Sequence, residues 1–121
     1  MNIHESAEDY LEAILRLREQ KGFVRSVDIA GMLGVTKPSV SFAMKRLREN
    51  GFILMDEDNL ITLTEEGAAI ARRVYDRHKT LVAYLVSIGV SEETAREDAC
   101  KIEHDISEET FSALRRQLAQ N

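Results

Sequence analysis

Apolar residues recur every three or four positions through most of this chain, which is the spacing of helices that bury one face. The first such run covers residues 6–20, with Ser6 as the expected N-cap and Gly22 just beyond its end. A shorter run covers residues 26–34, and its apolar residues, Val27 among them, are expected to face the core. These two runs predict a long helix followed by a short one.

A third run, within "GVTKPSVSFAMKRLRENG", has clear helix boundaries. Thr36 suits the N-cap, Pro38 suits the first turn, and Gly51 suits the left-handed position after the last turn. Two apolar stretches, "FILM" and "LITL", then flank the polar "DEDN" and predict a two-stranded hairpin. The first sixty residues therefore predict three helices and a hairpin.

Helical spacing returns in the second half. Thr64 is the expected cap of a helix reaching about residue 88, Ser91 caps the next, and Ser107 caps a short one to about residue 118. The predicted fold is mainly α. We expect an N-terminal winged helix-turn-helix DNA-binding domain at 1–63, and a helical dimerisation and metal-sensing domain at 64–121, joined by a linking helix at 64–88.

Two helices joined by a tight turn, the second basic, followed by a hairpin, are typical of a winged helix-turn-helix that reads DNA. The third helix would be the reader, because its polar and basic side chains face outward. Hydroxyl and amine groups suit base edges and phosphates, and an exposed Phe suits a thymine methyl or a sugar face. The candidate DNA-binding residues are Arg25, Thr36, Lys37, Pro38, Ser39, Ser41, Phe42, Lys45 and Arg46.

Charge is distributed unevenly along the chain. The net charge of −5 argues mildly against nucleic acid, but residues 24–50 hold five basic side chains against two acidic ones, and 91–121 hold eight acidic against four basic. A phosphate backbone responds to local charge, so the basic footprint favours DNA. The hairpin tip, Asp56 to Asp58, would repel phosphate and is expected to make little DNA contact.

Composition limits the remaining classes. Hydrophobic residues make up 44% of the chain, which is enough for a core, and no apolar run approaches membrane-spanning length. The N-terminus is too acidic for a signal peptide. A single Cys cannot form an internal disulfide, so a cytoplasmic location without membrane association is expected.

The stretch "CKIEHD" places Cys100, Glu103 and His104 at i, i+3 and i+4, which is one face of a helix. His78 lies in the apolar stripe of the preceding helix. A carboxylate pair, Asp9 and Glu12, lies on the first helix. If these helices pack together, their oxygen, nitrogen and sulfur donors would form a transition-metal site.

Each of these residues has a structural alternative. The thiol could simply pack in a core, Glu103 and His104 could be solvated, and His78 could be a satisfied core histidine. Asp9 could complete a helix cap, and Glu12 could pair with Arg16 one turn on. Burial and mutual distance decide between the two readings.

The sequence resembles the metal-dependent repressors of the diphtheria toxin repressor and manganese transport regulator family. The stretches "SAEDYLEAILRL", "VDIAGMLGVTKPSVS", "LTEEG", "RHKTL" and "EDACKIEHDIS" follow the family's order and spacing. The resemblance implies that a divalent metal activates a homodimer to bind a double-stranded operator and repress metal-uptake genes. It implies that Asp9, Glu12, His78, Glu103 and His104 are metal ligands of the manganese type.

Cys100 departs from that type, which has a carboxylate at this position. Iron-type members have Cys there but usually Met at the Asp9 position, so this chain is a hybrid. Iron-type members also have a polar base-reading residue where this chain has Phe42. The sequence ends soon after residue 118, and the shorter, manganese-type arrangement is therefore expected.

Carboxylates and imidazoles favour Mn²⁺ or Fe²⁺, while the thiolate shifts preference toward softer ions, so that Zn²⁺ also fits. The candidate ligands outnumber the four positions of one tetrahedral site, so the chain could bind either one ion or two. Two rival classes remain: a metalloenzyme, for which no separate general base stands out, and a metal-independent winged-helix DNA-binding or protein-interaction module. An apolar set that includes Ile88, Ala99 and Phe111 predicts a dimer through the last two helices, with the linking helix contributing.

Overall fold

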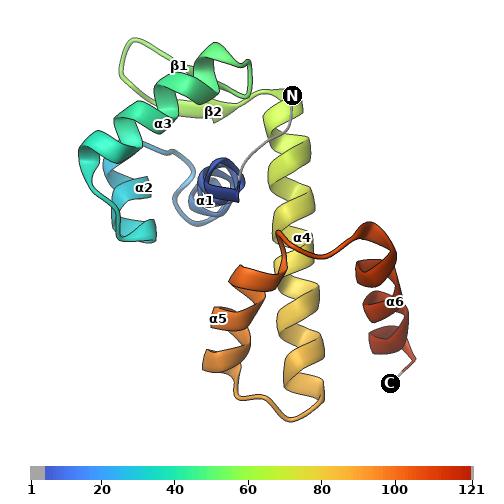
Figure 1. Cartoon of the computed structure of the whole chain (residues 1–121). Coiled ribbons are helices and arrows are strands. Elements are labelled where there is room, and N and C mark those ends of the chain that lie inside the picture. The colour runs from blue at the N-terminus through green and yellow to red at the C-terminus, as the bar shows by residue number, and fades with distance from the viewer. Residues whose placement is uncertain (1–4, 121) are drawn as a thin grey trace. The chain divides into compact units, whose positions relative to one another are not determined.

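The computed structural model describes residues 5–120 and consists of six helices and one two-stranded sheet over that range (Figure 1). The chain forms two compact units that divide between Arg72 and Arg73, inside the long helix α4, Glu65–Ser87. The sequence-based division after residue 63 stays a prediction. Within the described range, no helix is long and apolar enough to cross a membrane.

The N-terminal unit holds α1 (Glu5–Lys21), α2 (Ser26–Leu33), α3 (Lys37–Glu49) and the hairpin β1 (Ile53–Met55) and β2 (Ile61–Leu63). The strands are antiparallel, with Ile53 opposite Leu63 and Met55 opposite Ile61. The hairpin joins the helices through its buried residues and through a backbone hydrogen bond from Ile61 to the Val24 carbonyl at 2.8 Å. The fully buried large side chains of the N-terminal unit are Leu11, Ile14, Val24, Ile29, Val40, Met44, Ile53 and Ile61.

Two predictions about α1 and α2 were wrong. Ser6 lies inside α1, because the helix already includes Glu5. Val27 is 55% exposed, whereas Ile29 is buried. The two residues are two positions apart on a helix of eight residues, so they point to nearly opposite sides, and only one of them can face the core.

The boundaries of α3 agree with those predicted. The Thr36 hydroxyl accepts the Ser39 N–H at 3.3 Å, and Pro38 occupies the first turn. The helix ends at Glu49, and Gly51 follows with a φ of 79°, in the left-handed region that glycine adopts without strain. This reversal lets the chain enter β1 directly.

The start of α4 is packed tightly against the chain segment that precedes β1. The Thr64 hydroxyl accepts the Gly67 N–H at 3.1 Å and donates to the Gly51 carbonyl at 2.7 Å. A Cβ atom on Gly67 would lie only 2.0 Å from the Phe52 carbonyl oxygen. The glycine of "LTEEG" is therefore required for this close approach.

The C-terminal unit consists of the second half of α4 with α5 (Glu92–Ile102) and α6 (Glu108–Ala119). Ser91 and Ser107 cap the two short helices, as predicted, by accepting the N–H groups of Thr94 and Thr110. The unit's buried apolar side chains are Val74, Leu81, Ala95, Ala99 and Phe111. Of the apolar set expected to form a dimer surface, Ala99 and Phe111 are thus internal, while Ile88 is 59% exposed.

Candidate functional site

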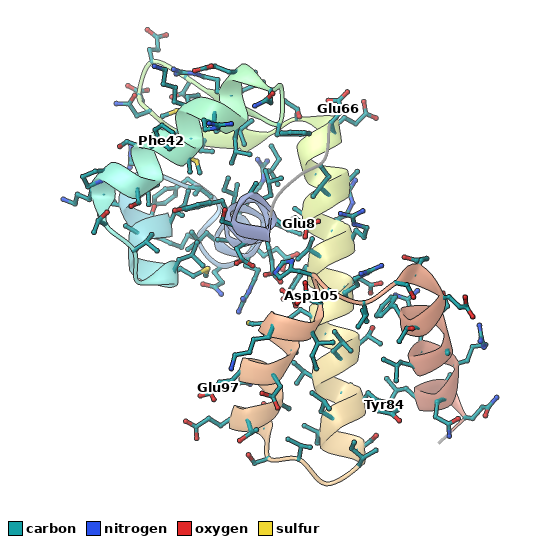
Figure 2. All side chains as sticks on the ribbon, viewed as in Figure 1. Glu8, Phe42, Glu66, Tyr84, Glu97 and Asp105 are labelled. Carbon is teal, nitrogen blue, oxygen red and sulfur yellow. The ribbon has the colours of Figure 1, made fainter. Side chains whose placement is uncertain are left out.

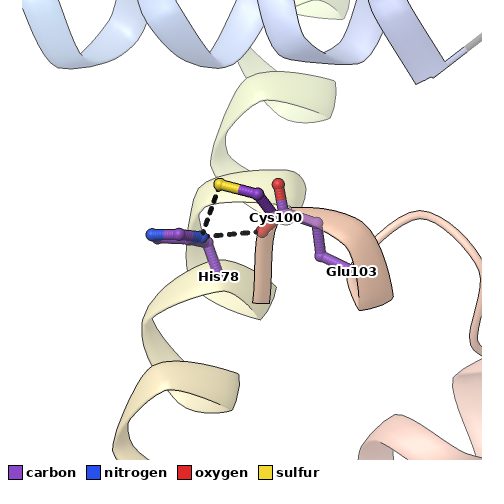
Figure 3. A group of neighbouring side chains, drawn as sticks. All are labelled: His78, Cys100 and Glu103. Atoms are coloured by element: carbon purple, nitrogen blue, oxygen red, sulfur yellow. Dashed lines mark hydrogen bonds and ion pairs between the residues drawn. The ribbon is translucent and has the colours of Figure 1, made fainter. Parts of the chain in front are cut away.

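Three potential metal ligands meet in the C-terminal unit: His78 from α4, Cys100 from α5, and Glu103 directly after α5. The His78 Nδ1 atom lies 2.9 Å from a Glu103 carboxylate oxygen and 3.9 Å from the Cys100 Sγ atom. Figure 3 shows the thiol and the carboxylate directed at the same imidazole nitrogen. One ligand atom from each residue lies within 4.8 Å of the others.

Local backbone geometry brings Cys100 and Glu103 to one side. Cys100 lies in the last turn of α5, and Glu103 keeps helical φ and ψ of −58° and −24° as the C-cap residue. The two side chains therefore share one face, as the i, i+3 spacing predicts. The prediction for His104 was wrong in one respect, because α5 ends at Ile102 and His104 lies beyond it. A turn toward the Ser107 cap replaces the expected last helical turn.

His104 nevertheless stays close to this cluster. Its Nε2 atom lies 3.4 Å from the second carboxylate oxygen of Glu103. That oxygen, Oε1, is buried and accepts no hydrogen bond from any of residues 5–120. A buried carboxylate oxygen normally accepts a hydrogen bond or binds a cation, and this one has, among the described residues, only the 3.4 Å contact with His104, so a metal ion would suit it.

Burial bears on two of the structural alternatives, those for Glu103 and Cys100, whereas the assignment of these residues as ligands stays a prediction. Glu103 is only 2% exposed, so it is not a solvated carboxylate, and Cys100 is exposed, so it is not a packed core thiol. His78 is buried, with both of its contacts directed at titratable groups. The hydrogen bond with Cys100, and after it that with Glu103, raises the pKa of His78 to about 10, while burial opposes the change.

This donor set fits a divalent transition metal. Imidazole nitrogen, carboxylate oxygen and thiolate sulfur are the three ligand types that Zn²⁺ and Fe²⁺ share, and three ligands within one small cluster leave room for others.

The remaining predicted ligands, Asp9 and Glu12, lie on α1 in the N-terminal unit. They are three residues apart and thus lie on neighbouring turns of one helix. Both carboxylates take part in polar interactions. Their place in a metal centre remains a prediction.

The candidate DNA-binding face lies on α3, whose buried stripe is Val40, Met44 and Leu47. The opposite side exposes every residue that the sequence predicted there: Lys37, Pro38, Ser39, Ser41, Phe42, Lys45 and Arg46. Phe42 is 63% exposed (Figure 2). The Arg46 guanidinium lies 5.7 Å from its ring centroid, which forms a cation–π pair on the outer surface.

Arg25 is the N-cap of α2 and Thr36 is the N-cap of α3, and both are exposed. The Asp28 carboxylate accepts the Arg25 backbone N–H at 2.9 Å and the Lys21 ammonium at 2.6 Å. The hydrogen bond from Lys21, followed by that from Arg25, lowers the pKa of Asp28. The backbone of Arg25 is thereby held at the start of α2, and its role in DNA binding stays a prediction.

The acidic hairpin tip has a structural role. The Asp56 carboxylate accepts the N–H groups of Asp58 and Leu60, both at 2.9 Å, and so closes the turn between β1 and β2. Asn59 adopts a φ of 62° within that turn. The expectation that this tip avoids DNA remains a prediction.

The sequence pattern did not identify one residue that contacts the cluster of His78, Cys100 and Glu103. Arg77 donates to the backbone carbonyl of Glu103 at 3.2 Å. An arginine beside a buried histidine on an amphipathic helix normally faces solvent, so periodicity gives no sign of such a contact. The only available signal was the absence of a charge partner for Arg77 one turn away on its own helix.

A winged helix-turn-helix with an exposed basic helix, together with a helical unit that gathers metal-binding side chains, defines the class of metal-dependent DNA-binding regulators. Two family models match the chain: the iron dependent repressor N-terminal DNA binding domain over residues 2–59, and the iron dependent repressor metal binding and dimerisation domain over residues 64–120. The chain belongs to the iron dependent repressor family.

Known proteins support this assignment. The transcriptional regulator MntR of Escherichia coli O6:H1 is 41% identical over 111 residues, covering 92% of this chain and 72% of MntR. The crystal structure of IdeR from T. acidophilum is similar over 98% of this chain and 55% of its own, with a TM-score of 0.84 and 29% identity. The structure of the manganese regulator SloR is similar over 100% of this chain and 56% of its own, with a TM-score of 0.83 and 26% identity. The chain thus spans about half the length of these two solved structures.

Proposed function

We propose that a divalent metal ion, bound by Asp9, Glu12, His78, Cys100, Glu103 and His104, activates this chain to bind an operator as a homodimer and to repress metal-uptake genes. The observation that carries the proposal is the convergence of His78, Cys100 and Glu103, with a buried carboxylate oxygen left without a hydrogen bond. The family resemblance adds the two α1 carboxylates and His104. A DNA-binding domain of residues 1–63 and a metal-sensing domain of 64–121 are part of the proposal.

The proposed ligands belong to both compact units of the chain. Asp9 and Glu12 lie on α1, and the other four lie on α4, α5 and the residues after α5. An ion that bonds to both sets would favour those conformers in which the ligands can meet. Its differential affinity for these conformers, typically about 1–3 kcal/mol of coupling, would be the source of activation.

Mn²⁺ or Fe²⁺ is the proposed physiological ion. The set contains three carboxylates and two imidazoles, which these ions accept, and SloR is a manganese regulator. The Cys100 thiolate is the softest donor and raises affinity for Fe²⁺ and Zn²⁺ relative to Mn²⁺. Selectivity in the cell would then depend on metal availability as much as on affinity.

Double-stranded DNA is the proposed partner of the exposed side of α3. Lys37, Lys45 and Arg46, together with Arg25, would contact phosphates, whereas Ser39, Ser41 and Phe42 would reach base edges. Thr36 and Pro38 would set the start of the reading helix. The exposed Phe42 ring, with Arg46 beside it, is accessible to a thymine methyl or a sugar face, which supports this role.

A homodimer is proposed because the matching C-terminal family model is a dimerisation domain and because Val86 and Ile88 are 44% and 59% exposed near the end of α4. Two copies would present two reading helices to two operator half-sites, about 34–36 Å apart for one helical turn. We further propose a cytoplasmic protein without enzymatic activity, in keeping with its family of transcriptional regulators.

A titration of operator binding against each metal tests the proposal. The operator is first selected from random duplex DNA in the presence of Mn²⁺, and binding is then measured with Mn²⁺, Fe²⁺, Zn²⁺ and a chelator. We expect tight binding with at least one ion and a loss of about tenfold or more with the chelator. Equal binding in all conditions would favour the metal-independent module instead.

A further inference from the structure

Two consecutive residues of α4 hold the same residue of the segment after α5. The His78 imidazole contacts the Glu103 carboxylate at 2.9 Å, and an Arg77 Nη1 atom donates to the Glu103 backbone carbonyl at 3.2 Å. The side chain and the main chain of this proposed ligand are therefore fixed from one helix. Arg77 itself is only 13% exposed at its side chain, so its guanidinium is committed to these contacts.

Arg77 also reaches past Glu103 into the next helix. The same Nη1 atom donates to the Ile106 carbonyl at 3.1 Å, and Nη2 pairs with the Glu108 carboxylate at 2.8 Å. The guanidinium stacks on Phe111 of α6, 5.2 Å from the ring centroid. One side chain thus ties the end of α5, the connecting residues and the first turns of α6 together.

The carbonyls that Arg77 holds have no helical partner. Glu103 is the C-cap of α5, and Ile106 precedes the N-cap of α6, so neither carbonyl can accept a bond within a helix. A planar guanidinium with several N–H donors suits two such acceptors at once, while a Lys ammonium lacks this fixed geometry. Arg77 thus supplies donors to two backbone carbonyls that flank His104.

We propose that Arg77 is a positioning residue for metal binding: it pre-orders the segment that carries Glu103 and His104 and couples that segment to α6. The inference rests on the proposed metal site and deepens it. Without Arg77, the ligands would have to be ordered when the ion binds, and the entropy of ordering would lower the affinity. Loss of such a supporting contact typically costs 10–100-fold in metal affinity.

The experiment compares Mn²⁺ and Co²⁺ affinity of the full chain, by competition with a fluorescent chelator, in the wild type and in Arg77→Gln. We expect affinity to fall by about tenfold or more in Arg77→Gln, with Arg77→Lys intermediate. Arg115→Gln is the matched control, since Arg115 stacks on the same Phe111 ring at 4.7 Å but pairs with Asp76. It should keep wild-type affinity.

Amide hydrogen exchange without metal separates positioning from a general loss of stability. The Glu103 and Asp105 N–H groups donate to Ala99 and Ile102, and the Ala95 N–H donates to Ser91 at the other end of α5. We expect Arg77→Gln to accelerate exchange at Glu103 and Asp105 and to leave Ala95 unchanged. Equal acceleration at all three amides would overturn the positioning role.

Two failures can be told apart. A wild type that binds none of the ions would overturn the proposed function. A wild type that binds Mn²⁺, with an affinity within twofold in both Arg77 variants, would overturn only the role of Arg77. Should Arg77→Gln fail to fold, Arg77→Lys decides the question, because it keeps the charge and the stem but loses the planar fork.

Discussion

His78 and Glu103, which are 25 residues apart in the sequence, meet through a contact of 2.9 Å between the imidazole Nδ1 atom and a carboxylate oxygen. Cys100 approaches the same nitrogen from one turn earlier on the chain. In the absence of metal, a proton on His78 Nδ1 would be donated mainly to the Glu103 carboxylate, since the Cys100 Sγ atom is farther away at 3.9 Å. A metal ion must displace that proton, so the metal-free and metal-bound proteins should respond oppositely to pH.

The first prediction concerns the stability of the metal-free protein. His78 has a pKa of about 10 in the folded chain against 6.5 when unfolded. Its contribution is fully present below pH 6.5 and is lost as pH rises to about 10, because the folded state then binds more protons than the unfolded one. Each pKa unit is worth about 1.4 kcal/mol. Urea denaturation with a chelator, from pH 6.5 to 9.5, should show falling stability, and His78→Gln should flatten the fall. Parallel curves would contradict this.

The second prediction concerns Cys100 as a thiolate ligand. Cys100→Ser should weaken binding of Zn²⁺ and Fe²⁺ more than that of Mn²⁺, because it removes the softest donor. Cys100→Glu should restore or sharpen the Mn²⁺ response. Both variants should fold, since Cys100 is exposed. Co²⁺ titration measured by near-ultraviolet absorption reports the thiolate directly, and the charge-transfer band should vanish in Cys100→Ser. A wild type without this band, and with the affinity of Cys100→Ser, would remove Cys100 from the site.

The third prediction concerns Gly67. An alanine there gains up to about 1 kcal/mol of helix propensity, but its Cβ would lie 2.0 Å from the Phe52 carbonyl. Overpacking of this kind costs about 1–3 kcal/mol, so Gly67→Ala should lower the free energy of unfolding. Gly31→Ala, in helix α2, is the matched control, because a Cβ atom added at Gly31 would meet nothing within 4 Å. It should stabilise the protein by about 0.5–1 kcal/mol. Chemical denaturation measures both, and a stabilised Gly67→Ala variant would rule out the close approach.

The fourth prediction concerns the DNA interface. Lys45 is exposed on the outer side of α3. Operator affinity should fall with salt, with a logarithmic slope of about −0.9 per phosphate neutralised, and Lys45→Ala should flatten that slope by about one unit per bound subunit. Asp58→Asn, at the hairpin tip, should leave affinity equal or higher. Fluorescence anisotropy over a salt series measures both variants, and an unchanged slope in Lys45→Ala would place that residue outside the interface.

Most of the fold was predictable from the sequence because its signals are local. The Thr36, Thr64, Ser91 and Ser107 caps begin helices α3 to α6, and hydrophobic spacing identified the buried stripe of α3. Short-range patterns failed where two local choices were nearly equal. Val27 and Ile29 are both apolar, and only packing decided which one faced the core.

The sequence by itself determined which residues could bind metal and which face of α3 could meet DNA, since spacing on a helix fixes which side chains share a side. Only the tertiary structure decided that His78, Cys100 and Glu103 come together, that α5 stops at Ile102, and that Arg77 holds the Glu103 carbonyl. The contacts of Arg77 and His78 with Cys100 and Glu103 join residues more than twenty positions apart. They follow from how α4 packs against α5 and α6 within the C-terminal unit, and periodicity along one helix contains no record of that packing.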